Sequence, residues 1–183
     1  TLQLEKGRRD LDYLNSVLEA IALAEGERDL QEIRQELTDT GYLRRPSKAR
    51  DRGKRVASKP MEFRSSAGLR ISVGRNNLQN DRLTTKLAGK YDYWLHTQKI
   101  HGAHVILWAE GQRPDDQSLH EAACLAAWFS QGREGKKVPV DYTPVKYVKK
   151  PAGARPGMVI YTTYRTVNVT PAEDLVRRLQ NGK

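Results

Sequence analysis

The sequence predicts an α+β domain with a mixed or mainly antiparallel sheet and packed helices, preceded by a coiled-coil-type helical segment. After residue 60, short runs rich in valine, tyrosine and threonine alternate with leucine- and alanine-rich runs of helical period. The predicted order is β-β-α-β-β-α-β-β-β-α, which favours an α+β arrangement. The first 43 residues carry only helical patterns. We therefore expect helices over 1–43, a basic flexible linker over 44–60 and a folded domain over 61–183.

The first helical segment has a heptad pattern of apolar residues. Its stripe consists of Leu4, Leu11, Leu14, Leu18 and Ile21, and after Gly26 the pattern restarts in a new register. A single helix cannot bury its own stripe. We therefore expect a partner helix from a longer arm, supplied by an N-terminal part of the protein that precedes Thr1. The alternative is that the helix packs on the following domain.

The folded domain is expected to begin near Met61. The predicted strands cover residues 62–64, 69–73, 92–97, 103–109, 138–148, 157–164 and 166–169. The predicted helices cover residues 76–88 and 115–130. Pro171 opens a short last helix that ends near Leu179.

The net charge is +10, and its distribution along the 183 residues is uneven. Residues 1–43 hold 5 basic and 10 acidic side chains, whereas residues 44–59 hold 8 basic and 1 acidic side chain. Residues 60–183 hold 19 basic and 11 acidic side chains. A positive field attracts polyanions, and nucleic acid is the commonest one in the cytoplasm. We therefore expect a nucleic-acid partner, against the alternative of a basic protein without one.

The sequence also bears on the compartment. No apolar run approaches the roughly 20 residues that span a bilayer. The first ten residues lack the apolar stretch of a signal peptide. The single cysteine, Cys124, cannot form an internal disulfide. These features predict a cytoplasmic protein with no membrane partner.

A dense polar run, from Gly74 to Asp81, lies at the junction between a predicted strand and a predicted helix. The first turn of a helix presents unpaired backbone N–H groups and a partial positive charge, which suit an anion. An arginine fork at the same place suits phosphate or a guanine edge. We therefore predict RNA contacts from Arg75, Asn76, Asn77, Gln79 and Asn80. The alternative is a well-capped helix start with solvent-facing amides.

Trp94, His96 and His104 fall on two predicted neighbouring strands. An exposed tryptophan or histidine can stack on an RNA base, so we predict RNA contacts from all three. A buried tryptophan is the alternative. The histidine spacing also raises the alternative of a metal-dependent RNA hydrolase that uses His96 and His104. No cysteine lies near and no carboxylate has a convincing ligand spacing, so we predict no metal site.

A further basic group lies near the end of the longest predicted strand. Lys146, Lys149, Lys150 and Arg155 gather around Tyr147 and are predicted to bind RNA phosphates and bases. No Ser-His-Asp order, carboxylate pair or Cys-His pair has a catalytic spacing. The Gly74 junction is neither a GxGxxG motif nor a Walker loop. The sequence thus predicts a protein without catalytic residues and without a cofactor.

Several sequence blocks occur in an order that resembles a known domain. They are Gly74-Arg75-Asn76-Asn77, Gln79-Asn80-Asp81, Trp94-Leu95-His96, Gly102-Ala103-His104-Val105, Glu121-Ala122-Ala123, Val140-Asp141-Tyr142-Thr143, Lys149-Lys150-Pro151 and Arg155-Pro156-Gly157. From Met61 to about Pro171 the chain resembles the NFACT-R domain. The segment up to Tyr42 is similar to the returning half of the coiled-coil arm that precedes this domain in the NFACT family.

The resemblance implies the C-terminal part of a bacterial ribosome-associated quality-control factor. Such factors bind the large ribosomal subunit (50S) that still holds a stalled peptidyl-tRNA. They recruit alanyl-tRNA and support untemplated alanine tailing of the nascent chain. In this family, peptidyl transfer belongs to the ribosome, and the polar blocks above form a signature surface. The signature residues matched here are Arg75, Asn76, Asn77, Gln79, Asn80, Trp94, His96 and His104.

Overall fold

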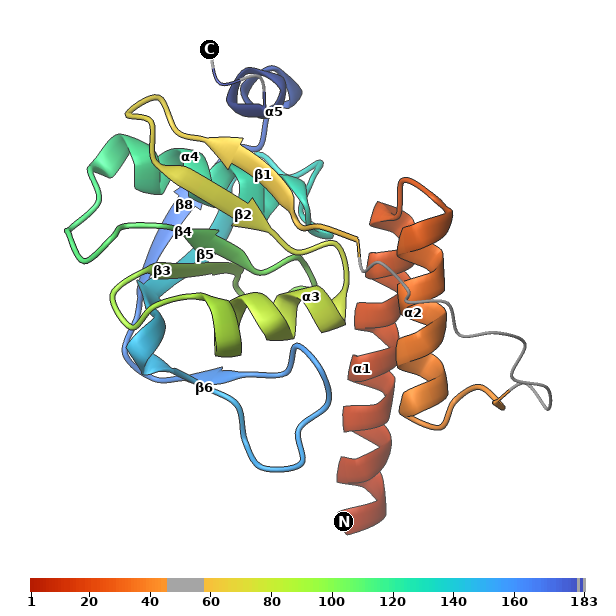
Figure 1. Ribbon diagram of the computed structural model, residues 1–183. Helices are drawn as coiled ribbons and strands as arrows, with labels where there is room; N and C mark the ends of the chain where they lie inside the picture. Colours follow the sequence, from red (N-terminus) through yellow and green to blue (C-terminus); the bar gives the residue numbers. More distant parts are fainter. Residues whose placement is uncertain (46–57, 181, 183) are drawn as a thin grey trace.

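The computed structural model describes residues 1–45, 58–180 and 182, and it has the predicted α+β fold. Its centre is a six-stranded sheet in the order β1-β2-β4-β3-β5-β8, and every neighbouring pair is antiparallel. The strands are β1 (Met61–Arg64), β2 (Arg70–Val73), β3 (Tyr93–Thr97), β4 (Val105–Leu107), β5 (Val138–Pro144) and β8 (Arg165–Val169). Figure 1 shows helices on both sides of this sheet.

The main core lies between the sheet and α4 (Asp116–Trp128). Asp115 caps this helix, because its carboxylate accepts the backbone N–H of Ser118 at 2.8 Å. The buried face of α4 is rich in alanine, which lets the helix lie close to the strands. The last helix, α5 (Glu173–Gln180), packs beside α4 and buries Val176 and Leu179.

The opposite face of the sheet carries a smaller core. Its cover consists of α3 (Asn77–Arg82), the π-helical segment η1 (Leu83–Leu87), the 3-10 turn η2 (Val145–Tyr147) and a two-stranded sheet of β6 (Val148–Lys149) and β7 (Ile160–Tyr161). Successive side chains of a strand point to opposite faces, so Leu95 joins the α4 side whereas Trp94 joins Leu83 on this side.

Two predicted strands are much shorter in the structure. The strand predicted over 138–148 ends at Pro144, where the backbone N–H of Val145 bonds to the carbonyl of Asp92 at 2.9 Å and the chain turns. The strand predicted over 157–164 keeps only β7, because Gly157 takes a φ of 78° and its N–H bonds to the Asp81 carboxylate at 3.1 Å. The helix predicted over 76–88 changes to π-helix at Leu83.

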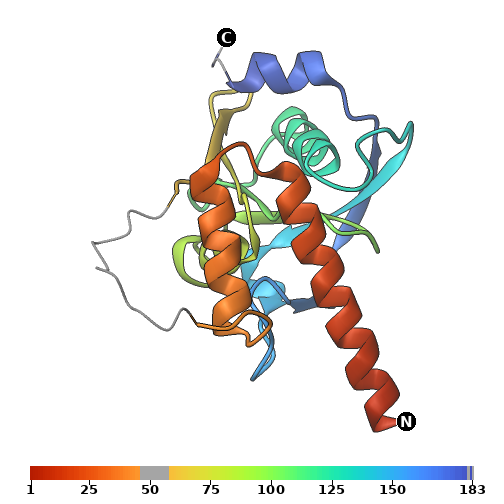
Figure 2. The ribbon, with the colours of Figure 1, turned by 90° about the vertical axis from the view of Figure 1, so that its right-hand side faces the viewer.

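The N-terminal residues form a helical hairpin of α1 (Leu2–Leu23) and α2 (Glu27–Asp39), which lies beside the domain (Figures 1 and 2). The two helices bury Tyr13, Val17, Ala20 and Ile33 against each other, and both contact α3. No helix among the described residues combines the length and apolar character that a membrane crossing requires. Most of the expected linker, residues 46–57, lies outside the described residues.

The heptad stripe of α1 is not the face that packs. Leu4, Leu11 and Leu18 are 60%, 61% and 61% exposed, and within the stripe only Leu14 joins the hairpin core. The helix contacts α2 and α3 through the neighbouring face that carries Tyr13. The described residues therefore leave the stripe uncovered, and the partner helix expected for it stays a prediction.

A buried carboxylate fastens the turn between β1 and β2 to α4. Glu121 is fully buried and accepts hydrogen bonds from the backbone N–H of Ser66 at 2.7 Å and from its hydroxyl at 2.5 Å. The side-chain amide of Gln117 donates a third bond at 3.0 Å. Such a carboxylate stabilises the fold only while its donors remain in place.

We expect Glu121→Ala to lower the free energy of unfolding by about 2–4 kcal/mol, because both Ser66 donors lose their acceptor. Urea denaturation followed by tryptophan fluorescence measures the change. The control is Glu134→Ala, an exposed glutamate after α4, which should change stability by less than about 0.5 kcal/mol. Equal stabilities of the two variants would contradict the role of Glu121.

Candidate nucleic-acid interface

The junction between β2 and α3 depends on the close approach of Gly74 to Asn80. A Cβ atom on Gly74 would lie 2.0 Å from Oδ1 of Asn80, a distance that no side chain tolerates. This Oδ1 accepts the backbone N–H of His104 at 3.1 Å, and the N–H of Gly74 bonds to the carbonyl of His104 at 3.1 Å. Glycine at this position thus serves the packing of strand against helix.

Asn76 and Gln79 cap the start of α3 reciprocally. Oδ1 of Asn76 accepts the backbone N–H of Gln79 at 3.0 Å, and Oε1 of Gln79 accepts the backbone N–H of Arg75 at 3.0 Å. The pair resembles a capping box with amides in place of a hydroxyl and a carboxylate, except that the Gln79 side chain reaches back to the residue before the N-cap. The capped-helix alternative therefore describes these two residues, although their amides do not face solvent.

The amide N–H groups of the junction bind the helical hairpin. Asn76 donates to Glu32 at 2.6 Å, and Gln79 donates to the same carboxylate at 3.0 Å. Asn77 donates to Glu36 at 3.0 Å. These side chains are buried, so RNA would reach them only if the hairpin moved away. RNA contact by Asn76, Asn77, Gln79 and Asn80 stays a prediction.

Arg75 joins the hairpin as well. Its Nη1 lies 3.3 Å from a carboxylate oxygen of Glu25 and 3.6 Å from one of Asp29. Its Nε donates to the carbonyl of Lys59 at 3.0 Å. A phosphate would compete with these acceptors for the guanidinium.

Arg155 connects the loop between β6 and β7, called the far loop below, to the hairpin. Its Nη2 lies 2.6 Å from Oδ1 of Asp10, and its guanidinium lies over the neighbouring rings of Tyr13 and Tyr42, 4.7 and 5.0 Å from their centroids. The hydrogen bond from Arg155 holds the pKa of Asp10 below its ordinary value. Arg155 is therefore a packed cation with carboxylate and aromatic partners.

The remaining lysines of the predicted site are all exposed but differ in their partners. Lys150 pairs with Asp81 at 2.7 Å. Lys146 and Lys149 are exposed, and Nζ of Lys146 lies 4.8 Å from the ring centroid of Tyr147 and 5.4 Å from that of Tyr91. Lys149 has no carboxylate partner within the described part of the chain. These two lysines, together with exposed tyrosine rings, form the part of the predicted site that RNA can reach directly.

Trp94, His96 and His104 do lie together, as the strand register requires. The rings of Trp94 and His96 are stacked with centroids 5.7 Å apart, and His104 meets Trp94 edge-on at 5.4 Å. Trp94 is only 1% exposed, so the buried-tryptophan alternative holds for it. His96 lies on a cavity of about 270 Å³ that reaches Tyr161.

Burial lowers the pKa of both histidines, that of His104 to about 3. Both histidines are therefore uncharged at neutral pH. They could contact RNA through ring surfaces and hydrogen bonds, but they contribute no positive charge. Nδ1 of His104 is already bonded to the Thr84 hydroxyl at 2.8 Å. Among the residues in the described ranges, no group of three or more His, Cys, Asp or Glu side chains is placed to hold a metal ion.

The acceptors of this interface were missed by sequence reasoning. Glu32, Glu36, Asp10 and Asp29 receive the donors of the junction and of the far loop. The available signal was the excess of acidic residues over 1–43, opposite a basic domain. That asymmetry indicated intramolecular pairing as well as a nucleic-acid partner.

Glu36 supplies a pH test of the contact between hairpin and domain. It is 1% exposed, and burial raises its pKa even though Tyr13 donates a hydrogen bond to it at 2.7 Å and Asn77 donates another. When the pKa of a carboxyl group is higher in the folded than in the unfolded protein, the group contributes fully to the free energy of unfolding at pH values below its unfolded-state pKa. That contribution is lost as pH rises through the folded-state pKa.

We therefore expect the wild type to lose stability relative to Glu36→Gln as pH rises above about 4.5, because only the wild type must ionise a buried group. Thermal unfolding at each pH measures the difference. Glu27→Gln, an exposed change on the same helix, should follow the wild type across the range. A constant difference between wild type and Glu36→Gln would show that Glu36 does not titrate abnormally.

Comparisons with known proteins agree with this architecture. The model described as "NFACT protein RNA binding domain" matches residues 59–162, and that of the "NFACT N-terminal and middle domains" matches residues 1–56. Rqc2 homolog RqcH of Bacillus subtilis is 41% identical over 182 residues, covering 98% of this chain and 31% of that protein. The Streptococcus suis RqcH is 38% identical over 181 residues, covering 97% of this chain and 31% of that protein.

A solved structure shares the whole arrangement. It is the C-terminal part of the fibronectin/fibrinogen-binding protein of Streptococcus suis, with a TM-score of 0.89 and 37% identity over 98% of this chain and 70% of that one. This chain spans about a third of the length of the curated relatives named above. Because the RNA binding domain model covers more than half of the residues, the chain belongs to the NFACT family.

Proposed function

We propose that the chain is the RNA-binding module of a ribosome quality-control factor. The observation that carries the proposal is the match of residues 59–162 to the NFACT RNA binding domain. The likeness to RqcH over nearly the full chain supports the quality-control role. The exposed Lys146 and Lys149 supply phosphate-binding groups on this domain.

In this proposal the module works in the cytoplasm on 50S subunits that hold a stalled peptidyl-tRNA, and it supports recruitment of alanyl-tRNA for alanine tailing. Its own part is to hold RNA, and it is not an enzyme. The proposed RNA site comprises the exposed Lys146, Lys149 and Lys150, together with Arg75 and Arg155, which face the hairpin and offer phosphate contacts when the hairpin moves away from the domain. The alternative of a metal-dependent hydrolase using His96 and His104 gains no support, because no third His, Cys, Asp or Glu side chain in the described ranges is placed to complete a metal site with them.

We expect the purified chain to bind tRNA and 50S subunits at low salt and to lose affinity steeply as salt rises. Lys149→Ala and Arg75→Ala should each weaken binding and lower the salt slope by about 1, because each removes one phosphate contact. Filter binding over a salt series measures both quantities.

The control is Lys137→Ala, which removes an exposed lysine before β5 and should leave the tRNA affinity unchanged. Immobilised fibronectin serves as a comparison ligand, because the Streptococcus suis relative is described as fibronectin/fibrinogen-binding. No affinity for tRNA or 50S subunits at low salt, with or without fibronectin binding, would refute the proposed function.

A further inference from the structure

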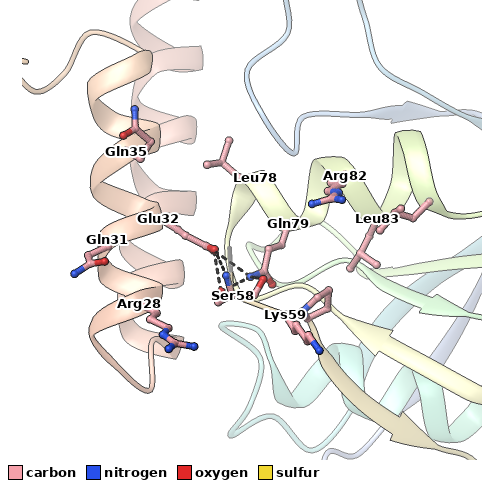
Figure 3. A pocket seen from close by; sticks show the side chains of 12 residues that line it. Arg28, Gln31, Glu32, Gln35, Ser58, Lys59, Leu78, Gln79, Arg82 and Leu83 are labelled. Atoms are coloured by element: carbon pink, nitrogen blue, oxygen red, sulfur yellow. Dashed lines mark hydrogen bonds between the residues drawn. The ribbon is translucent and has the colours of Figure 1, made fainter. Parts of the chain in front are cut away.

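A separate cavity of about 440 Å³ lies between α2 and the α3–η1 helix (Figure 3). Its volume falls within the range of small-molecule sites. Apolar side chains form much of its wall, namely Pro60, Leu78, Leu83 and Leu87. Leu87 is 47% exposed, so this apolar surface is open to solvent.

The two walls of the cavity are joined by a fixed hydrogen-bond cluster. Glu32 of α2 accepts the backbone N–H and the hydroxyl of Ser58 at 2.5 and 2.9 Å, and it also accepts the amide of Gln79 at 3.0 Å (Figure 3). The carboxylate thus has several donors of its own. The cavity is preformed, and the oxygens of its acidic residue already accept hydrogen bonds from the protein.

Three cations surround this cavity, and they differ from those of the Gly74 junction. Arg28, Lys59 and Arg82 line it and are exposed. Within the part of the chain that the structure describes, no carboxylate lies at ion-pair distance from any of them, whereas Arg75 and Arg155 are paired. Unpaired cations beside an apolar wall suit an anion that also has an apolar face.

The wall also contains the π-helical segment. Leu83 and Leu87 are the first and last residues of η1, which follows α3 without a break. Leu83 is fully buried in the core, whereas Leu87 reaches the solvent side of the cavity. Such π-helical turns are rare and occur frequently at functional sites.

We propose that this cavity binds one unpaired nucleotide of RNA, with the base against the leucine wall and the adjoining phosphates at Arg28, Lys59 and Arg82. The proposal rests on the RNA-binding function proposed above and names a subsite for it. A base supplies the apolar face, and phosphates supply the charge that these three cations lack. Lys59 is also the last residue of the basic stretch 44–59 of the sequence.

The test uses adenosine 5′-monophosphate and ribose 5-phosphate as probes for the isotope-labelled chain, followed by NMR. We expect the nucleotide to shift the amide signals of Arg28, Gln31, Arg82 and Leu87. Leu87→Ala should weaken this response severalfold and leave the response to ribose 5-phosphate unchanged, because only the base contacts the leucine. Arg28→Gln combined with Arg82→Gln should weaken both responses.

The same double variant should lower the salt slope for a single-stranded RNA decamer by about 1.4, from two contacts of about 0.7 each. The matched control is Arg113→Gln combined with Lys136→Gln, which removes the same charge from exposed loops flanking α4 and should bind like the wild type. Wild-type RNA binding that the cavity variants leave intact would overturn this subsite and spare the proposed function. Absence of wild-type binding to any RNA would overturn both.

Discussion

The arrangement of the whole chain depends on two carboxylates of α2 that accept amide hydrogens from the start of α3. Glu32 binds Asn76 and Gln79, and Glu36 binds Asn77, so a helical hairpin is held against the strand-to-helix junction. Hydrogen bonds from amide donors to carboxyl oxygens count strongly in a buried setting. The Asn76 amide also caps α3 through its oxygen, and the Gln79 oxygen accepts the backbone N–H of Arg75, so the junction connects the hairpin to the domain.

Because the junction side chains both cap α3 and bind the hairpin, the polar junction has a structural role in addition to any role in binding RNA. A row of asparagine, glutamine and arginine side chains resembles a ligand site, but here most of its donors already have protein acceptors. In the described part of the chain, exposed cations with no carboxylate at ion-pair distance lie, among other places, around the cavity at η1 and near Tyr147. Burial and pairing, rather than residue type, separate the groups that hold the fold from those that are available to RNA.

Sequence reasoning identified the fold class and most elements, because strand alternation and alanine-rich helical patterns reflect burial directly. It overextended the strand that ends at Pro144 and missed the π-helix at Leu83, since both are fixed by contacts across the fold. It grouped Trp94, His96 and His104 correctly from their strand positions. It could not foresee that Arg155 packs against Tyr13, because that pairing spans more than 140 residues.

The hairpin is attached to the domain along its length, for example near its turn through Arg75, in its middle through Asn77 and toward its open end through Arg155. These contacts together fix the direction of α1 relative to the sheet. The uncovered leucines of α1 therefore face a set direction. Any helix that packs along these leucines would take a fixed orientation relative to the sheet. A displacement of the distant end of that helix would then be transmitted through α1 to the RNA-binding domain.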